Sequence, residues 1–254
     1  MRLCKVVIGV KPQKRLFRFT SLSGELIDAV MDVVGGQVLP DEYFTRVRRS
    51  SDSSSITMMD EKEKAVNSLT VDTDNVVFTK DHYVKSGRID FNDVFREFQA
   101  IWQACDAVLK VRDIRRIGMV GEYRIVPPNN PSAALLSFTH IEARGVPAKF
   151  QMQFESRVLT TGDSGLPDVK TSDFWNTIES YYDSALDTEH SEEGQITAMI
   201  DVQRYYMPLL DGNVPDDVRK LKRRYDDVVR QIGDRAVIKS LELETRSEHV
   251  EQAE

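Results

Sequence analysis

The strongest constraint on the fold lies between residues 90 and 126, where an amphipathic helix runs directly into a long alternating strand. Apolar residues recur every three or four positions from Phe91 to Leu109, and Asp90 precedes them as a helix N-cap would. The strand segment sets apolar side chains against polar ones: Ile117, Met119, Tyr123 and Ile125 against Arg116, Glu122 and Arg124. A core-facing helix that leads into a half-polar strand predicts an α+β protein.

Two further helices are predicted on either side of this unit. Helical spacing from Leu22 to Val33 ends at Gly35, and a second apolar stripe begins after Pro215 and ends at Gly233. The expected fold class is α+β, with predominantly antiparallel β-sheet and about three main helices, over about 21–34, 90–110 and 215–232.

Period-two alternation predicts strands in much of the remaining chain. Besides the strand that follows the central helix, the predicted strands cover 16–20, 68–72, 76–80, 146–158, 174–183 and 196–206. The second and third of these are joined by turn-prone residues at Asp72–Asn75, which predicts a hairpin. In Val146–Val158 apolar residues occupy most even positions, so we expect one face of this strand in the core and the other in water.

The domain organisation follows from composition. No linker rich in Pro, Gly or Ser divides the chain, so we expect a single α+β domain over 1–243, with possible related sub-halves at 1–126 and 127–243. The polar run 49–55 holds no apolar residue and is predicted to be a mobile loop. The acidic segment 244–254 is predicted to be a frayed tail.

Charge and cysteine usage restrict the possible partners and location. The formal net charge of −7 repels phosphate backbones and anionic membranes on average. Cys4 and Cys105 stand far apart, and Cys105 falls on the apolar stripe of the central helix, which favours buried thiols in a reducing compartment. The apolar run Val6–Val10 is too short for a signal peptide or a membrane span. We expect a cytoplasmic protein that does not contact a membrane.

Common catalytic and cofactor motifs are missing from the sequence. It holds no phosphate loop, no dinucleotide-binding glycine pattern, no His-Glu-x-x-His and no Gly-x-Ser-x-Gly. Gly118 and Gly121 lie inside a predicted strand, where glycine indicates a bulge or close packing. The histidines share no element: His82, His140, His190 and His249. We therefore expect no metal site and no bound cofactor.

One candidate ligand site is the polar face of the predicted sheet. Antiparallel pairing could bring onto one surface Arg116, Glu122, Arg124, Lys149, Glu155, Arg157, Asp201 and Gln203. Arginines on such a surface could bind a phosphorylated small molecule, and carboxylates could hold a metal that bridges to it. The alternative is that these charges only solvate an exposed sheet face through cross-strand pairs.

A second candidate is the one dense basic run, on the last predicted helix. Its cationic residues are Arg219, Lys220, Lys222, Arg223 and Arg224. They could contact nucleic-acid phosphates. Acidic residues flank them at three- and four-residue spacing, so intrahelical ion pairs are the favoured interpretation: Asp216, Asp217, Asp226 and Asp227.

The segment Arg116–Ile125, preceded by the helix from Asp90 and followed by Ile200-Asp201-Val202, resembles a sporadically distributed family of bacterial proteins of unknown function. Members are about as long as this chain and carry an Arg-Ile-Gly-Leu-Arg-Tyr-x-Asn-like strand after a helix. Here Val120 and Gly121 replace the Arg-Tyr pair. The resemblance implies no established reaction, and its patchy distribution is typical of mobile-element or defence-associated genes.

Three functional hypotheses follow. The leading one is a noncatalytic interaction or accessory module that binds a protein partner or a second copy of itself, and it predicts an uncovered apolar patch or sheet edge. An enzyme or sensor for a phosphorylated small molecule would require the polar-face side chains to converge. A nucleic-acid binder would require the basic run 219–224 to be exposed and unpaired.

Overall fold

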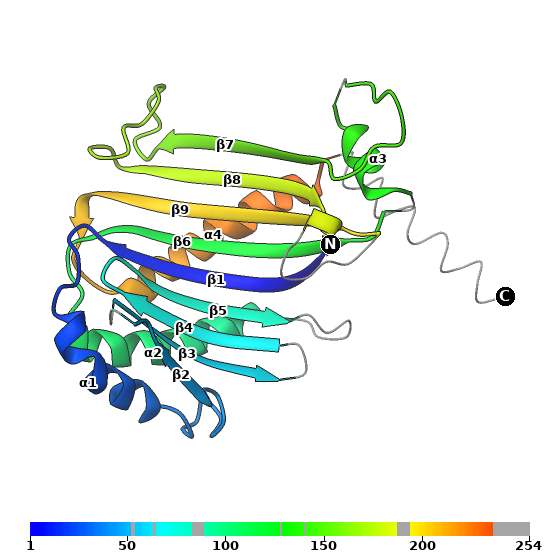
Figure 1. Cartoon of the computed structure of the whole chain (residues 1–254). Coiled ribbons are helices and arrows are strands. Elements are labelled where there is room, and N and C mark those ends of the chain that lie inside the picture. The colour runs from blue at the N-terminus through cyan, green and yellow to red at the C-terminus, as the bar shows by residue number, and fades with distance from the viewer. Residues whose placement is uncertain are drawn as a thin grey trace.

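The computed structural model describes residues 1–51, 54–62, 65–82, 89–127, 129–139, 141–186 and 194–235. In this part of the chain nine strands form one antiparallel sheet, in the order β2-β3-β4-β5-β1-β6-β9-β8-β7 (Figure 1). The strands are β1 (Arg2–Pro12), β2 (Arg46–Arg49), β3 (Ser55–Lys62), β4 (Ala65–Asp72), β5 (Val76–His82), β6 (Ile114–Ile125), β7 (Gln151–Leu159), β8 (Phe174–Asp183) and β9 (Ile196–Leu210). The predicted α+β class with a predominantly antiparallel sheet is confirmed.

The four α-helices of the described residues are α1 (Phe19–Met31), α2 (Phe91–Leu109), α3 (Pro131–Leu136) and α4 (Val214–Gly233). A 3₁₀ turn, η1, covers Ser184–Leu186. Asp90 caps α2 as predicted, because its side chain accepts a hydrogen bond from the Asn92 N–H. No helix among the described residues is long and apolar enough to cross a bilayer.

The strand order repeats on either side of the central β1–β6 pair. After β1 the chain forms α1, then strands that return from the edge of the sheet to β5, then α2. After β6 it forms α3, then β7, β8 and β9 from the opposite edge inward, then α4. The second run therefore begins at Ile114 with β6, which occupies the place that β1 has in the first run.

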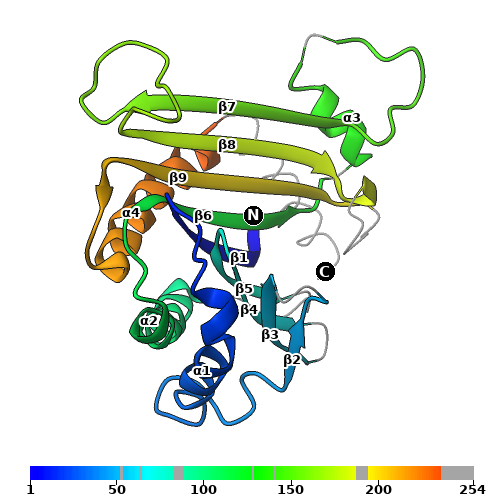
Figure 2. The same cartoon turned by 60° about the vertical axis from the view of Figure 1, so that its left-hand side comes forward.

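One face of the sheet carries the helices and the core. Figure 2 shows α1, α2 and α4 on the same side of the twisted sheet. Val6, Ile8 and Val10 of β1 lie opposite Gly121, Met119 and Ile117 of β6 on this face, and all three apolar residues of β1 are buried. The opposite face is called the polar face below. Arg116, Glu122 and Arg124 of β6 lie on it, as the alternation predicted.

Several predicted boundaries were wrong. The strand expected at 16–20 is absent, because a turn covers Phe17–Arg18 and α1 begins at Phe19, which is fully buried. The helix α3 was not predicted. The strand expected from Val146 begins only at Gln151, since residues 141–150 form a loop in which Val146 is 86% exposed. Here the alternating apolar pattern of 146–150 did not indicate a strand.

The two segments predicted to be mobile lie partly or wholly outside the described residues. Of 49–55, residues 52 and 53 are not described. Ser50 and Ser55 are joined across the connection between β2 and β3, because the Ser50 N–H donates to the Ser55 carbonyl and the Ser55 N–H donates to Ser50 Oγ. The predicted tail 244–254 lies outside the described residues.

Candidate functional site

The strand register brings most of the predicted ligand residues onto the polar face. Directly opposed residues point to the same side of a sheet. The successive pairs β6–β9, β9–β8 and β8–β7 therefore identify which residues lie on the polar face. One row runs Val120, Asp201, Ile178 and Glu155, and the next runs Gly118, Gln203, Asn176 and Arg157. Lys149 is not among them, because it lies exposed in the loop before β7.

Arg124 and Glu122 form a buried ion pair at one end of the polar face. Arg124 Nη2 lies 3.1 Å from Glu122 Oε1, and both side chains are about nine-tenths buried. Arg124 Nη1 also donates to Ser184 Oγ at 3.0 Å and to the hydroxyl of Thr197. These residues were expected on a wet face, but their polar atoms are bonded within the protein. The guanidinium is therefore used for internal structure and is poorly placed to bind phosphate.

The middle of the polar face is rich in hydrogen-bond acceptors. Gln203 Nε2 donates to Asp201 Oδ2 at 2.5 Å, and Asn176 Nδ2 donates to Gln203 Oε1 at 3.4 Å. The other carboxylate oxygen of Asp201, Oδ1, and the amide oxygen of Asn176 are buried without a hydrogen-bond partner among the described residues. Burial raises the pKa of Asp201, although Gln203 and the charge of Arg116 oppose the rise. Unpartnered acceptors repel a phosphate group, so this region does not favour an anionic ligand.

The remaining charges of the polar face form separate local contacts. Arg116 Nη1 donates to Tyr205 Oη at 3.3 Å, and its guanidinium lies over the Tyr205 ring. Arg157 Nη2 donates to Glu155 Oε1 at 2.8 Å on β7, at the far edge of the sheet. In the part of the chain that the structure describes, no three His, Cys, Asp or Glu side chains are grouped to hold a metal.

The basic run on α4 is largely neutralised by its own helix. Arg219 bonds to Asp216 at 2.7 Å and Lys220 to Asp217 at 3.2 Å, while Lys222 bonds to the carboxylate of Asp226. Arg223 is exposed with no carboxylate partner among the described residues, whereas Arg224 is half-buried and its Nε is unpartnered. Two cations without partners are too few for a phosphate-tracking surface.

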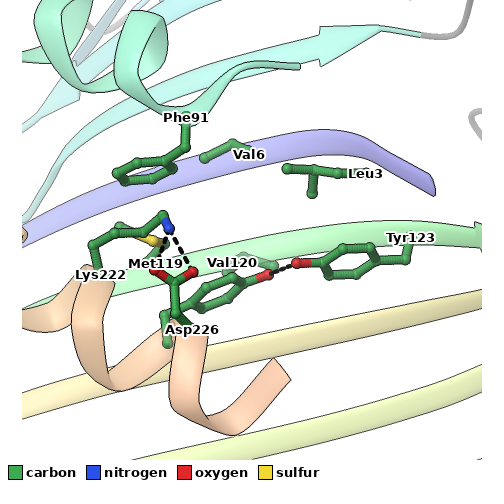
Figure 3. A pocket seen from close by; sticks show the side chains of 9 residues that line it. Leu3, Val6, Phe91, Met119, Val120, Tyr123, Lys222 and Asp226 are labelled. Atoms are coloured by element: carbon green, nitrogen blue, oxygen red, sulfur yellow. Dashed lines mark hydrogen bonds and ion pairs between the residues drawn. The ribbon is translucent and has the colours of Figure 1, made fainter. Parts of the chain in front are cut away.

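A small pocket lies on the helix-covered face between α2, α4, β1 and β6 (Figure 3). Its volume is about 70 Å³, well below the size of pockets that hold metabolites. Tyr225 Oη donates to Tyr123 Oη at 3.0 Å, and Lys222 Nζ lies 4.3 Å from the centre of the Phe91 ring. Its polar side chains are paired with one another, Lys222 with Asp226 and Tyr225 with Tyr123, so the pocket is a packing gap between α2, α4 and the sheet.

Exposed large apolar side chains gather on β7 and on the two loops that flank it. Phe154 and Val158, on the helix-side face of β7, are 55% and 46% exposed. Of the eleven exposed large apolar side chains in the described residues, six lie here: Ile141, Val146, Phe154, Val158, Leu166 and Val169. We call β7 with its flanking loops 141–150 and 160–173 the β7 surface. The expectation that the apolar face of this strand lies in the core was wrong beyond Met152, because α4 packs mainly against β6 and β9.

The β7 surface is also an open sheet edge, whereas the other edge is guarded. Among the described residues β7 is the last strand of the sheet and pairs only with β8 (Figure 1). At the other end β2 has four exposed residues, of which three are arginines. Short length and like charges are devices that prevent an edge from pairing with another chain, and β7 has neither. No local pattern in the sequence predicts this difference, because it depends on the order of the strands in the sheet.

The chain matches no protein-family model and no curated protein. Function therefore has to follow from the geometry of the molecule itself.

Proposed function

We propose that this protein is a noncatalytic interaction module that holds another polypeptide at the β7 surface. The observation that carries the proposal is the coincidence of an unpaired strand edge with six exposed large apolar side chains on the same strand and its loops. Either feature alone is common on soluble proteins. Their coincidence is typical of surfaces that bind a partner.

The backbone of β7 supports binding by strand addition. The Phe150 carbonyl accepts a hydrogen bond from the Asp183 N–H, and the Thr160 N–H donates to the Asp173 carbonyl. Even-numbered residues of β7 therefore direct their backbone groups toward β8. Odd-numbered residues direct theirs toward the open edge, where an added strand can bond to them.

The side chains of β7 offer different chemistry on its two faces. Phe154 and Val158 provide an apolar contact on the helix side, and Glu155 and Arg157 provide a charged contact on the polar side. A strand that pairs with β7 would meet both faces at once. This combination of backbone bonds, apolar contact and charge is what gives edge-strand binding both affinity and selectivity.

The cytoplasm is the compartment we propose, because both cysteines are buried and unpaired, as they are in proteins of reducing compartments. The polar face does not favour the small-molecule hypothesis, since its charges are divided among separate internal pairs.

Native mass spectrometry of the protein, gently isolated from its own host, tests this proposal. We expect a stoichiometric protein complex with the natural chain, lost with Phe154→Asp and kept with Val47→Asp. Val47 is a matched control, because it is an exposed apolar residue, 43% accessible, on the opposite edge strand. A complex that survives Phe154→Asp would overturn the proposal. So would a natural chain that carries no protein partner but carries a small-molecule adduct, if that adduct is lost with Arg124→Ala.

A further inference from the structure

We infer that the partner of the β7 surface is a second copy of this chain, paired antiparallel through β7 about a two-fold axis at Ser156. The inference rests on the proposed function and names its partner. It follows from the order of residues on β7, which is complementary to itself when the strand is reversed. In this register the residues that face each other across the axis have numbers that add to 312.

The charges of β7 select this register. Glu155 would lie opposite Arg157 of the second copy, and Arg157 opposite the second copy's Glu155. Within one chain Arg157 already bonds to Glu155 Oε1, while Glu155 Oε2 has no bond among the described residues. Reversed pairing would therefore place four charges in a ring in which every neighbour has the opposite sign.

Neighbouring registers lack this complementarity. An axis at Glu155 would place two glutamates face to face, and an axis at Arg157 would place two arginines face to face. Like charges directly opposed in an antiparallel pair are destabilising. With the axis at Ser156, the two residues that face each other on the axis are serines, whose side chains are small and uncharged.

The backbone parity agrees with the same register. Glu155 and Arg157 are odd-numbered, so their N–H and C=O groups point to the open edge, and they would form a hydrogen-bonded pair across the interface. Ser156 and its counterpart would form a non-hydrogen-bonded pair, in which the side chains approach most closely.

The apolar residues complete the match. Phe154 would lie opposite Val158 of the second copy, twice by symmetry, on the helix-side face where both are exposed. Because the strands run in opposite directions, the loop 160–173 of one copy would lie beside the loop 141–150 of the other. The exposed Leu166 and Val169 of one loop would then meet the exposed Ile141 and Val146 of the other.

The first test uses the purified full-length chain alone. Sedimentation velocity over a concentration series should show a monomer–dimer equilibrium. Ser156→Cys should form a disulfide-linked dimer under mild oxidation, because the non-hydrogen-bonded Cα separation of about 4.5 Å suits a disulfide. The matched control is Gln153→Cys, whose two copies would lie ~20 Å apart and should not link. The natural cysteines are both buried and should not compete.

The second test uses charge. Glu155→Arg alone and Arg157→Glu alone should each weaken self-association at least tenfold, since each opposes like charges. An equimolar mixture of the two single variants should form a heterodimer, because each arginine then faces a glutamate. The double variant E155R/R157E should recover a homodimer.

A monomeric natural chain, a Ser156→Cys variant that links no faster than Gln153→Cys, or single variants that do not pair when mixed would overturn the inference. Failure here is distinguishable from failure of the proposed function. A purified chain that stays monomeric while the host-isolated protein carries a different protein, released by Phe154→Asp, overturns self-pairing and leaves the proposed function standing.

Discussion

Gly121 on β6 lies directly under the hydroxyl of Tyr225 on α4. A Cβ placed on Gly121 would lie 1.8 Å from Tyr225 Oη and 2.8 Å from its Cζ. The same hydroxyl donates to Tyr123 Oη at 3.0 Å (Figure 3). The absence of a side chain at position 121 therefore sets how closely α4 packs on the sheet, which is the close packing that a glycine inside a strand indicated.

Gly121→Ala should destabilise the protein by about 2–3 kcal/mol, because an added methyl group in a packed core forces its neighbours to move. Urea unfolding followed by circular dichroism measures the change. The matched control is Gly9→Ala on the adjacent strand β1, where a Cβ meets nothing within 4 Å and the change should be small.

The contact with Tyr225 can be separated from a general effect of alanine in a strand. Tyr225→Phe removes the atom nearest to the new methyl group, so the double variant G121A/Y225F should be more stable than the sum of the two single changes. Additive changes would show that α4 is not positioned by this contact.

Lys80 and Glu97 form an ion pair on the helix-covered face, between β5 and α2. Lys80 Nζ lies 2.6 Å from Glu97 Oε1, and Glu97 Oε2 also accepts the Tyr43 hydroxyl at 2.8 Å. Glu97→Leu leaves a buried ammonium without its counter-ion and should cost about 3–5 kcal/mol. The exposed pair Arg219–Asp216 is the control, and Asp216→Ala should cost less than about 1 kcal/mol.

Replacing both partners of the buried pair should be less harmful than replacing one. K80M/E97L removes both charges and should recover most of the stability that Glu97→Leu loses. Chemical denaturation of Lys80→Met, Glu97→Leu and K80M/E97L measures this directly. A double variant that is less stable than either single one would show that Lys80 and Glu97 stabilise the fold beyond their mutual attraction.

Asp201→Asn should stabilise the protein at neutral pH by about 1 kcal/mol, because it removes a buried charge with an unpartnered oxygen. The pKa of Asp201 is raised above its ordinary value of 3.8, chiefly by burial. Its protonated form therefore favours folding at low pH, and that contribution is lost as the pH rises through the raised pKa.

The effect of Asp201→Asn on the free energy of unfolding should depend on pH. The stability difference between Asp201→Asn and the natural chain should be large at pH 7 and vanish near pH 3, where the aspartate is protonated in both states. Asp211→Asn, at an exposed position in a weak contact with Arg112, should change little at either pH. A destabilising Asp201→Asn at pH 7 would mean that the carboxylate binds a cation, or a donor besides Gln203.

The sequence was sufficient for the fold class and for the strongest elements. The stripe of α2 and the alternation of β6 could be recognised because each places its apolar side chains on one side, against a single continuous core. The prediction of a strand at 16–20 was wrong, because a short apolar segment has the same local pattern whether it begins a helix or forms a strand. The burial of Phe19 at the start of α1 decides between the two.

The β7 surface could be predicted only in part. Alternation identified the strand, and the register confirms that Glu155, Arg157 and Asp201 share one face. Which strand would be left at the edge depends on the order of nine strands, a long-range property that no local pattern contains. Whether Phe154 lies under a helix depends on where α4 packs, which is decided by contacts with β6 and β9 far away in sequence.

Amide hydrogen exchange along β7 should alternate with residue number when the protein is monomeric. The N–H groups of Gln153, Glu155 and Arg157 point to the open edge, whereas those of the even-numbered residues bond to β8. At low protein concentration the odd amides should therefore exchange at least tenfold faster than the even ones. This ratio can be measured residue by residue with nuclear magnetic resonance.

Raising the protein concentration distinguishes strand pairing from contact through the loops alone. If β7 pairs with a second β7, its odd amides gain hydrogen-bond partners and their exchange should slow to the rate of the even amides. The Glu155→Arg variant should keep the fast odd amides at the same concentration, because its strands repel. Odd amides that stay fast in a demonstrated dimer would place the contact in the flanking loops, with the edge of β7 still open to water.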